Sequence, residues 1–120
     1  MEKVIQDVQE ALRKRGLETT ALGSNALAYW GDMGNFRLSL LPGNARVVIS
    51  HAVWLPEERR GQGLGRKLLG IRMAALRLAG AKLVLATVKN NNRREIRLLR
   101  DRAFNRLIKF GSTSLWGKAL

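Results

Sequence analysis

The feature that most constrains the fold is a glycine-rich turn between an apolar segment and an amphipathic helix. Residues 45–55 are rich in β-branched and aromatic side chains, which predicts a central strand ending at Pro56. Three glycines follow at alternate positions, namely Gly61, Gly63 and Gly65. Residues 64–78 then carry apolar side chains at spacings of four and three, which indicates a helix. With a second apolar strand over 82–88, this predicts parallel strands joined by a right-handed crossover.

The helix over 64–78 has an apolar stripe and several basic residues away from it. The stripe consists of Leu64, Leu68, Ile71, Ala75 and Leu78. The basic residues off the stripe are Arg66, Lys67, Arg72 and Arg77. A stripe of this kind is the side that packs on a sheet, so the basic residues are expected on other sides of the helix.

The remaining patterns predict a mixed sheet in one domain over residues 1–120. The further expected elements are a helix over 3–15 ending at Gly16, strands over 26–30 and 35–41, a helix over 93–102, and a hairpin of 105–110 with 113–116. The earlier strands are expected to pair antiparallel, whereas the unit around the glycine turn requires parallel pairing.

Composition excludes some classes of site and leaves others open. The chain has no cysteine and one histidine, His51, so we expect no disulfide and no thiolate or multi-histidine metal site. We see no leader peptide and no segment long enough to span a bilayer, so a cytoplasmic protein without a membrane partner is expected. The formal net charge of +13 favours polyanionic partners, although a basic surface without such a partner is an equally simple explanation.

The glycine turn has the chemistry of a phosphate site. Glycine lacks a Cβ, so its backbone amides can approach an anion closely, and the start of a helix adds unpaired amides and a partial positive charge. Basic side chains surround the turn: Arg59, Arg60, Arg66 and Lys67. A Walker loop is excluded because no Ser or Thr follows Lys67, and the dinucleotide fingerprint fails because its third glycine would arrive one residue early.

Arg60-x-x-Gly63-x-Gly65 resembles the Arg/Gln-x-x-Gly-x-Gly/Ala signature of the GCN5-related N-acetyltransferases (GNAT). A second resemblance runs from Asn92 to Phe104, where that family often has Asn-x-x-Ala-x-x-Leu-Tyr-x-Lys-x-Gly-Phe. Here Glu95 replaces the Ala and Leu99 replaces the Tyr. The resemblance implies an α/β (α+β) fold with a GNAT-like mixed central sheet, about three flanking helices and a truncated N-terminal part.

The resemblance also implies a site for acetyl-CoA as co-substrate. The pyrophosphate would lie on the segment Arg60, Gly61, Gln62, Gly63, Leu64 and Gly65, with help from Arg66. Backbone groups of Val53, Trp54 and Leu55 would bind the pantetheine arm as an added strand does, and Asn92 would contact it from the other side.

The activity implied is transfer of an acetyl group to an amine. His51 and Glu57 are candidate bases, although His51 is also explained as a strand histidine bonded to a neighbour. The amide of Val53 is a candidate donor to the developing oxyanion. The usual proton donor to the leaving thiolate is a tyrosine, and Leu99 cannot replace it.

The sequence constrains the identity of the acceptor less than that of the cofactor. The basic surface disfavours a cationic acceptor and favours an amine carried on something acidic or linked to nucleic acid. The alternative is a member of the family that is weak or inactive as an enzyme and binds nucleic acid or a protein partner, for example through Arg93, Arg97 and Arg100. Small members of this family often form homodimers, so a homodimer is expected to be possible for this chain as well. Trp30 and Trp54 are expected in the core, and the alternative is that they stack on adenine, a base or a substrate.

Overall fold

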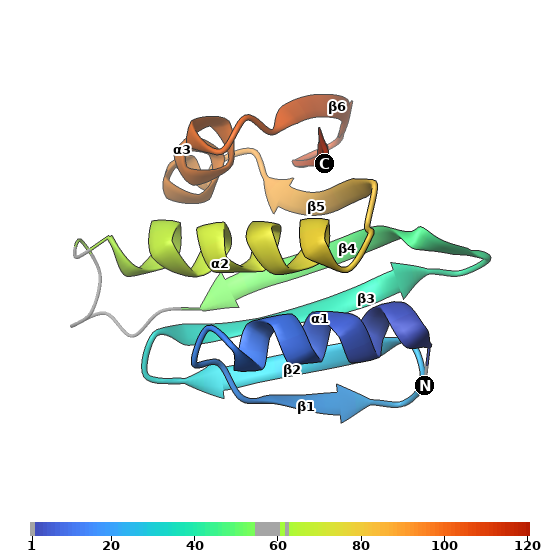
Figure 1. Ribbon diagram of the computed structural model, residues 1–120. Helices are drawn as coiled ribbons and strands as arrows, with labels where there is room; N and C mark the ends of the chain where they lie inside the picture. The colour runs from blue at the N-terminus through green and yellow to red at the C-terminus, as the bar shows by residue number, and fades with distance from the viewer. Residues whose placement is uncertain (1, 55–60, 62) are drawn as a thin grey trace.

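The computed structural model describes residues 2–54, 61 and 63–120, which form a mixed sheet of seven strands with three helices (Figure 1). In chain order the elements are α1 (Lys3–Arg13), β1 (Thr19–Leu22), β2 (Ala26–Gly31), β3 (Gly34–Leu41), β4 (Asn44–Trp54), α2 (Leu64–Leu78), β5 (Leu83–Lys89), α3 (Arg93–Asp101), β6 (Asn105–Phe110) and β7 (Thr113–Ala119). The strands lie in the order β1-β2-β3-β4-β5-β7-β6. The predicted α+β architecture is therefore confirmed.

The apolar side chains of residues 45–55 explain why this segment lies in the middle of the sheet. This run forms β4, which has three strands on either side of it. β4 pairs antiparallel with β3 and parallel with β5, as the intervening helix α2 requires. The predicted C-terminal hairpin is present as β6 and β7, and β7 extends to Ala119 to pair with β5.

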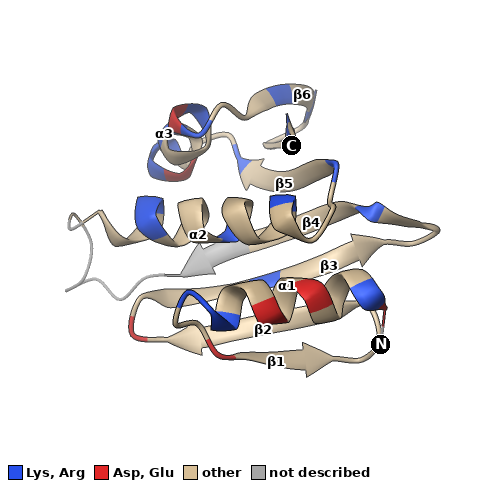
Figure 2. Ribbon diagram, viewed as in Figure 1, with Lys and Arg blue, Asp and Glu red and all other residues tan. Residues whose placement is uncertain are grey.

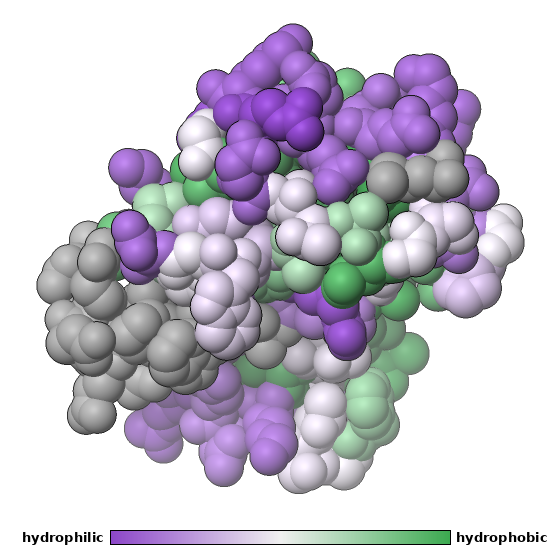
Figure 3. Space-filling model, turned by 90° about the horizontal axis from the view of Figure 1, so that it is seen from below, coloured by the Kyte–Doolittle hydropathy of each residue, from purple (hydrophilic) through white to green (hydrophobic). Residues whose placement is uncertain are grey.

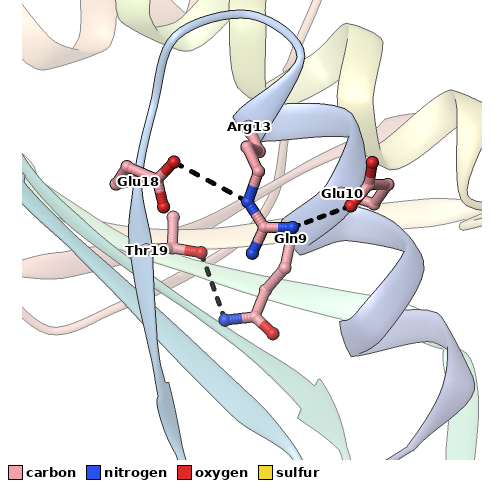
Figure 4. A network of polar contacts seen from close by, with 5 residues as sticks. All are labelled: Gln9, Glu10, Arg13, Glu18 and Thr19. Carbon is pink, nitrogen blue, oxygen red and sulfur yellow. Dashed lines mark hydrogen bonds and ion pairs between the residues drawn. The ribbon is translucent and has the colours of Figure 1, made fainter.

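A short polar network holds the end of α1 against the first strand (Figure 4). The Arg13 guanidinium contacts Glu10 at 2.9 Å and Glu18 at 3.7 Å, while Gln9 Nε2 donates to Thr19 Oγ1 at 3.3 Å. The helix ends before Gly16, which has a φ of +85°, a conformation that glycine adopts without steric cost. These contacts turn the chain from α1 directly into β1.

β1 is the strand that sequence patterns did not predict. Its four residues, Thr19 to Leu22, alternate between half-buried and exposed, so they carry no apolar periodicity. β1 exists because it pairs along its whole length with β2 and is tied to α1. Figure 3 shows the molecule from this edge, with hydrophilic residues at the top and at the lower left and pale and green residues between them.

The three helices pack on one face of the sheet. Arg72 of α2 reaches the ring of Phe36 on β3 and the hydroxyl of Ser50 on β4. By strand alternation and register, Ser50 lies on the same face of the sheet as Val84 and Ala86 of β5, and Ala86 pairs with Trp116 of β7. Arg100 of α3 lies over the Trp116 ring on that face. One core cluster fills this layer, and α1 packs beside α2. None of the helices described is long and apolar enough to cross a bilayer.

The buried side of α2 differs from the predicted stripe. Leu68 and Ala75 are fully buried as expected, but Leu78 is 68% exposed. Arg72, expected off the stripe, is only 1% exposed. The reason is geometric: Arg72 stands four residues after Leu68 and three before Ala75, so the helix turns it to the centre of the side that faces the sheet.

One tryptophan prediction was also wrong. Trp30 is 78% exposed, because it alternates with the buried Tyr29 on β2 and therefore points to the face without helices. Tyr29 instead stacks on Phe36 with ring centroids 5.3 Å apart. Only the backbone of Trp54 is described, so the prediction for its side chain lies outside the described residues.

The revised buried side of α2 predicts different costs for two leucines that the sequence placed on the same stripe. Leu68→Ala should lower the free energy of unfolding by about 2–5 kcal/mol, because it empties a fully packed site. Leu78→Ala should change it by about 0.5 kcal/mol or less, because that side chain is largely in water. Urea unfolding followed by circular dichroism measures both, and equal losses would contradict the packing described.

Candidate functional site

β4 and β5 separate in the middle of the sheet. The residue pairs between them are Val47 with Leu83, Val48 with Val84 and Ile49 with Leu85. Beyond these pairs β4 continues to Trp54 and β5 to Lys89, and the two strands diverge in Figure 1. β4 stays paired with β3, and β5 stays paired with β7. The facing edges of β4 and β5 therefore hold backbone groups that another extended molecule could pair with.

A pocket of about 230 Å³ lies where the two strands separate. Residues from four elements and from the loops on either side of α3 line it: Ser50, His51, Leu69, Arg72, Ala86, Thr87, Val88, Lys89, Asn92, Glu95, Leu99 and Phe104. The lining combines apolar side chains with a few polar and charged ones, which is the usual character of a small-molecule site.

The glycine turn stands next to this pocket at the start of α2. Gly61 and Gly63 have φ values of +79° and +75°, and a Cβ built on either would meet no atom of the described protein within 4 Å. Gly63 is the N-cap of α2, and the first turn has neither a side-chain cap nor an acidic residue. The first amides of α2 are thus available to an anion. One helical turn leads from Gly65 to Leu69 in the pocket.

Gly65 and Arg66 serve a different purpose from the first two glycines. A Cβ on Gly65 would lie 3.6 Å from Leu98 of α3, so this glycine faces the neighbouring helix. Arg66 forms an ion pair with Asp101 at the end of α3, and its carbonyl accepts a hydrogen bond from Arg102. These contacts join α2 to α3. Arg66 is still 59% exposed, so it is accessible from the solvent around the turn.

Arg72 is a buried cation in the wall of the pocket. Its Nη1 donates to Ser50 Oγ at 2.7 Å, and its guanidinium lies 4.8 Å from the centre of the Phe36 ring. Its Nε has no hydrogen-bond partner among the described residues. Burial lowers the pKa of Arg72 to about 10, an effect that the charge of Glu95 partly offsets. Arg72 therefore remains charged at neutral pH.

Three residues at α3 face the pocket. Asn92 caps the helix by accepting a hydrogen bond from the Glu95 amide at 3.2 Å. Glu95 is half-buried, and burial raises the pKa of its carboxyl, while Arg72 acts in the opposite direction. Leu99, at the position of the family's usual tyrosine, is buried and lines the pocket.

The His51 ring is held by residues of β3. His51 Nε2 lies 3.0 Å from Ser39 Oγ, and Nδ1 lies 3.5 Å from the Arg37 guanidinium. Partial burial lowers the pKa of His51, and the charge of Arg37 lowers it further. His51 is therefore neutral at neutral pH, with its ring bonded across the strands.

The structure brings together only part of the predicted site. Gly61, Gly63, Leu64, Gly65 and Arg66 lie at the start of α2, with His51 and Asn92 in the pocket lining. Val53 and Trp54 lie on the β4 backbone beyond its last pair with β5. Leu55, Glu57, Arg60 and Gln62 lie outside the described residues.

Sequence reasoning missed three charged residues of the pocket, Arg72, Lys89 and Glu95. Arg72 could have been found from its spacing, four residues after Leu68 and three before Ala75. Glu95 was noticed as a substitution in the downstream pattern. Its position three residues after Asn92 and four before Leu99 would have placed it on the same side of the helix as those two residues.

Comparison with known proteins agrees with this geometry. The model of the Acetyltransferase (GNAT) family matches residues 33–104. The fold is similar to an acetyltransferase from Thermus thermophilus, with a TM-score of 0.69 and 21% identity over 82% of this chain and 67% of the other. It is also similar to the PaiA N-acetyltransferase from Thermoplasma acidophilum in complex with coenzyme A, with a TM-score of 0.68 and 17% identity over 79% of this chain and 60% of the other.

A third similar structure is an acetyltransferase from Bacillus subtilis in complex with CoA, with a TM-score of 0.66 and 13% identity over 79% of this chain and 76% of the other. The chain thus spans about two thirds or less of the length of the first two structures. No curated protein sequence matches the chain. Because the family model covers more than half of the sequence, the chain belongs to the GNAT acetyltransferase family.

Proposed function

We propose that this protein transfers an acetyl group from acetyl-CoA to the amine of an acceptor. The observation that carries the proposal is the position of an open, glycine-lined helix start beside the gap between β4 and β5. The turn offers amides to a diphosphate, and the gap offers unpaired strand edges to an extended arm with amide groups. Coenzyme A has these two parts joined in one molecule.

The binding roles follow from these positions. The amides of Gly61, Gln62, Gly63 and Gly65 bind the pyrophosphate, and Arg60 and Arg66 add positive charge beside it. The backbone of Val53, Trp54 and Leu55 pairs with the pantetheine arm, and Asn92 contacts the arm from α3. The open space at Gly61 and Gly63 supports this arrangement, because a side chain there would occupy the space that the phosphates need.

The chemistry requires a thioester carbonyl in the pocket and an amine beside it. The amide of Val53 donates to the oxygen as negative charge develops on it. Leu99 cannot protonate the departing thiolate, so that proton comes from the attacking amine or from water. Positioning of the two reactants then accounts for much of the rate. Among the bases predicted from the sequence, His51 and Glu57 remain predictions.

Charge distribution supports an acidic acceptor. Residues 61–120 contain 14 of the 22 Lys and Arg residues but only 2 of the 9 Asp and Glu residues. Figure 2 shows basic residues on α2, α3 and β6, with some acidic ones on α3, whereas α1 carries both signs and acidic residues lie near β1 and β2. The part of the chain from α2 onward, which supplies most of the pocket lining, therefore carries most of the positive charge. This charge attracts an amine borne on an acidic molecule or on nucleic acid and repels a polyamine.

Acetyl-CoA should stabilise the wild-type protein, by about 2.7 kcal/mol at a hundredfold excess over its dissociation constant. Gly63→Ala should reduce this stabilisation strongly, because the added methyl group enters the phosphate space. Gly43→Ala is the matched control: Gly43 has a φ of +81° and equally open surroundings, but lies in the turn between β3 and β4. Both variants should lose about 1–2 kcal/mol of intrinsic stability from backbone strain.

Thermal melting with and without acetyl-CoA separates the strain from the binding effect. The expected result is a normal ligand shift in Gly43→Ala and a reduced one in Gly63→Ala. A wild-type protein that acetyl-CoA does not stabilise, or equal ligand shifts in the two variants, would contradict the proposed cofactor site.

The charge distribution predicts a preference among acceptors. A short peptide with acidic side chains and a free α-amino group should be acetylated faster than a neutral peptide of equal length, and spermidine should be slowest. The preference should shrink as salt rises, because the Debye length falls to about 3 Å at 1 M salt. Release of the CoA thiol measures the rates, and faster acetylation of spermidine would contradict an acidic acceptor.

A further inference from the structure

Glu95 is the one carboxylate among the described residues that line the pocket. It lies on α3 between Asn92 and Leu99, at spacings of three and four, so the three side chains share one side of the helix. Within the described part of the chain, no hydrogen bond or ion pair to its carboxylate oxygens is formed; the Asn92 contact is with its backbone amide. The carboxylate is therefore available to a molecule that enters the pocket.

Every other titratable residue among the described residues that line the pocket is basic, namely Arg72, His51 and Lys89. Arg72 lies on the helix-covered face of the sheet, as α3 does, whereas strand alternation turns the His51 and Lys89 side chains to the other face. Arg72 is fixed by Ser50 and is charged at neutral pH, so it favours the ionised form of Glu95. Burial works against ionisation and is the larger effect, so the pKa of Glu95 lies above its ordinary value. The raised pKa makes this carboxylate a better proton acceptor than a carboxylate in water.

We propose that the Glu95 carboxylate binds the ammonium group of the acceptor and takes a proton from it. The inference rests on the proposed acetyl transfer and names the base for that reaction. It is carried by three observations: the carboxylate lines the pocket, it has no hydrogen bond within the described residues, and a buried guanidinium stands across from it.

The reaction balances with the groups named. The acceptor ammonium gives one proton to Glu95 Oε, which leaves a neutral amine. The nitrogen lone pair forms a C–N bond with the thioester carbonyl carbon, the C–S bond breaks, and sulfur leaves with the electron pair. The second proton lost from nitrogen ends on the thiolate, directly or through water. Glu95 then releases its proton to solvent and becomes a carboxylate again.

In this scheme Arg72 is a positioning residue. It contacts Ser50 and Phe36, and it acts on the reaction through the charge of Glu95. Its buried charge favours the ionised carboxylate and so opposes the effect of burial, which favours the neutral acid. We assign the proton to Glu95 and not to His51, whose ring is bonded to Ser39 on β3.

The test is Glu95→Gln, which keeps the shape of the side chain and removes the proton acceptor. At neutral pH, kcat/KM for acetylation of the acidic peptide should fall by about 10²–10⁴-fold. The deficit should shrink as the pH rises through the pKa of the acceptor amine, because the amine is then neutral without help. The wild-type rate should fall as the pH drops below the raised pKa of Glu95, and Glu95→Gln should lose that limb of the profile.

Two further variants keep the result interpretable. Glu10→Gln on α1 makes the same chemical change at an exposed ion pair and should leave the profile unchanged. Glu95→Asp retains the carboxylate and should lose less activity than Glu95→Gln. All variants should keep the stabilisation by acetyl-CoA, which is measured in parallel by thermal melting.

The outcomes distinguish the two proposals. If the wild type acetylates none of the peptides, the proposed function fails and this inference fails with it. If the wild type is active and Glu95→Gln has the same rate and pH profile, only the role of Glu95 is overturned. Loss of activity at every pH by the same factor would also overturn it, since that result indicates a structural effect.

Discussion

The separation of β4 from β5 after three residue pairs is the constraint on which the site depends. Parallel strands in the middle of a sheet normally stay paired, because unpaired amides and carbonyls away from water are costly. Here α2 connects the two strands and covers the place where they diverge, so the gap becomes a pocket with polar backbone along its edges. The glycine turn lies at the start of the same helix. The anion site and the pocket are therefore both formed by the unit of β4, α2 and β5.

Arg72 connects the core to this pocket. It occupies a position on α2 that packing would give to an apolar residue. Among the described residues its partners are one hydrogen bond to Ser50, the face of the Phe36 ring and the charge of Glu95. A buried charge with so few partners contributes little to stability and often less than an apolar side chain of similar size. Its location opposite Glu95 indicates that its value lies in the electrostatics of the pocket.

Sequence patterns predicted most of the architecture, because the strands and helices of this chain obey the periods of two and 3.6 residues. β4, α2 and β5 were found with boundaries within one residue of those in the structure. β1 was missed because four residues at the edge of a sheet depend on pairing and not on an apolar pattern. The turn glycines were found from their spacing. Arg72 and Glu95 were not predicted, since a charged side chain suggests solvent, although their helical spacing places them on the inward sides of α2 and α3.

The unequal distribution of charge along the chain has a mechanical consequence for how ligands arrive. Residues 61–120 carry nearly all the excess positive charge, while residues 1–60 contain 8 basic and 7 acidic side chains and are almost neutral. The molecule is thus an electric dipole as well as a cation, and in the field of a polyanion it experiences a torque before any contact forms. It would turn α2, α3 and β6 toward the anion, so that encounters are oriented during diffusion and need little searching afterwards.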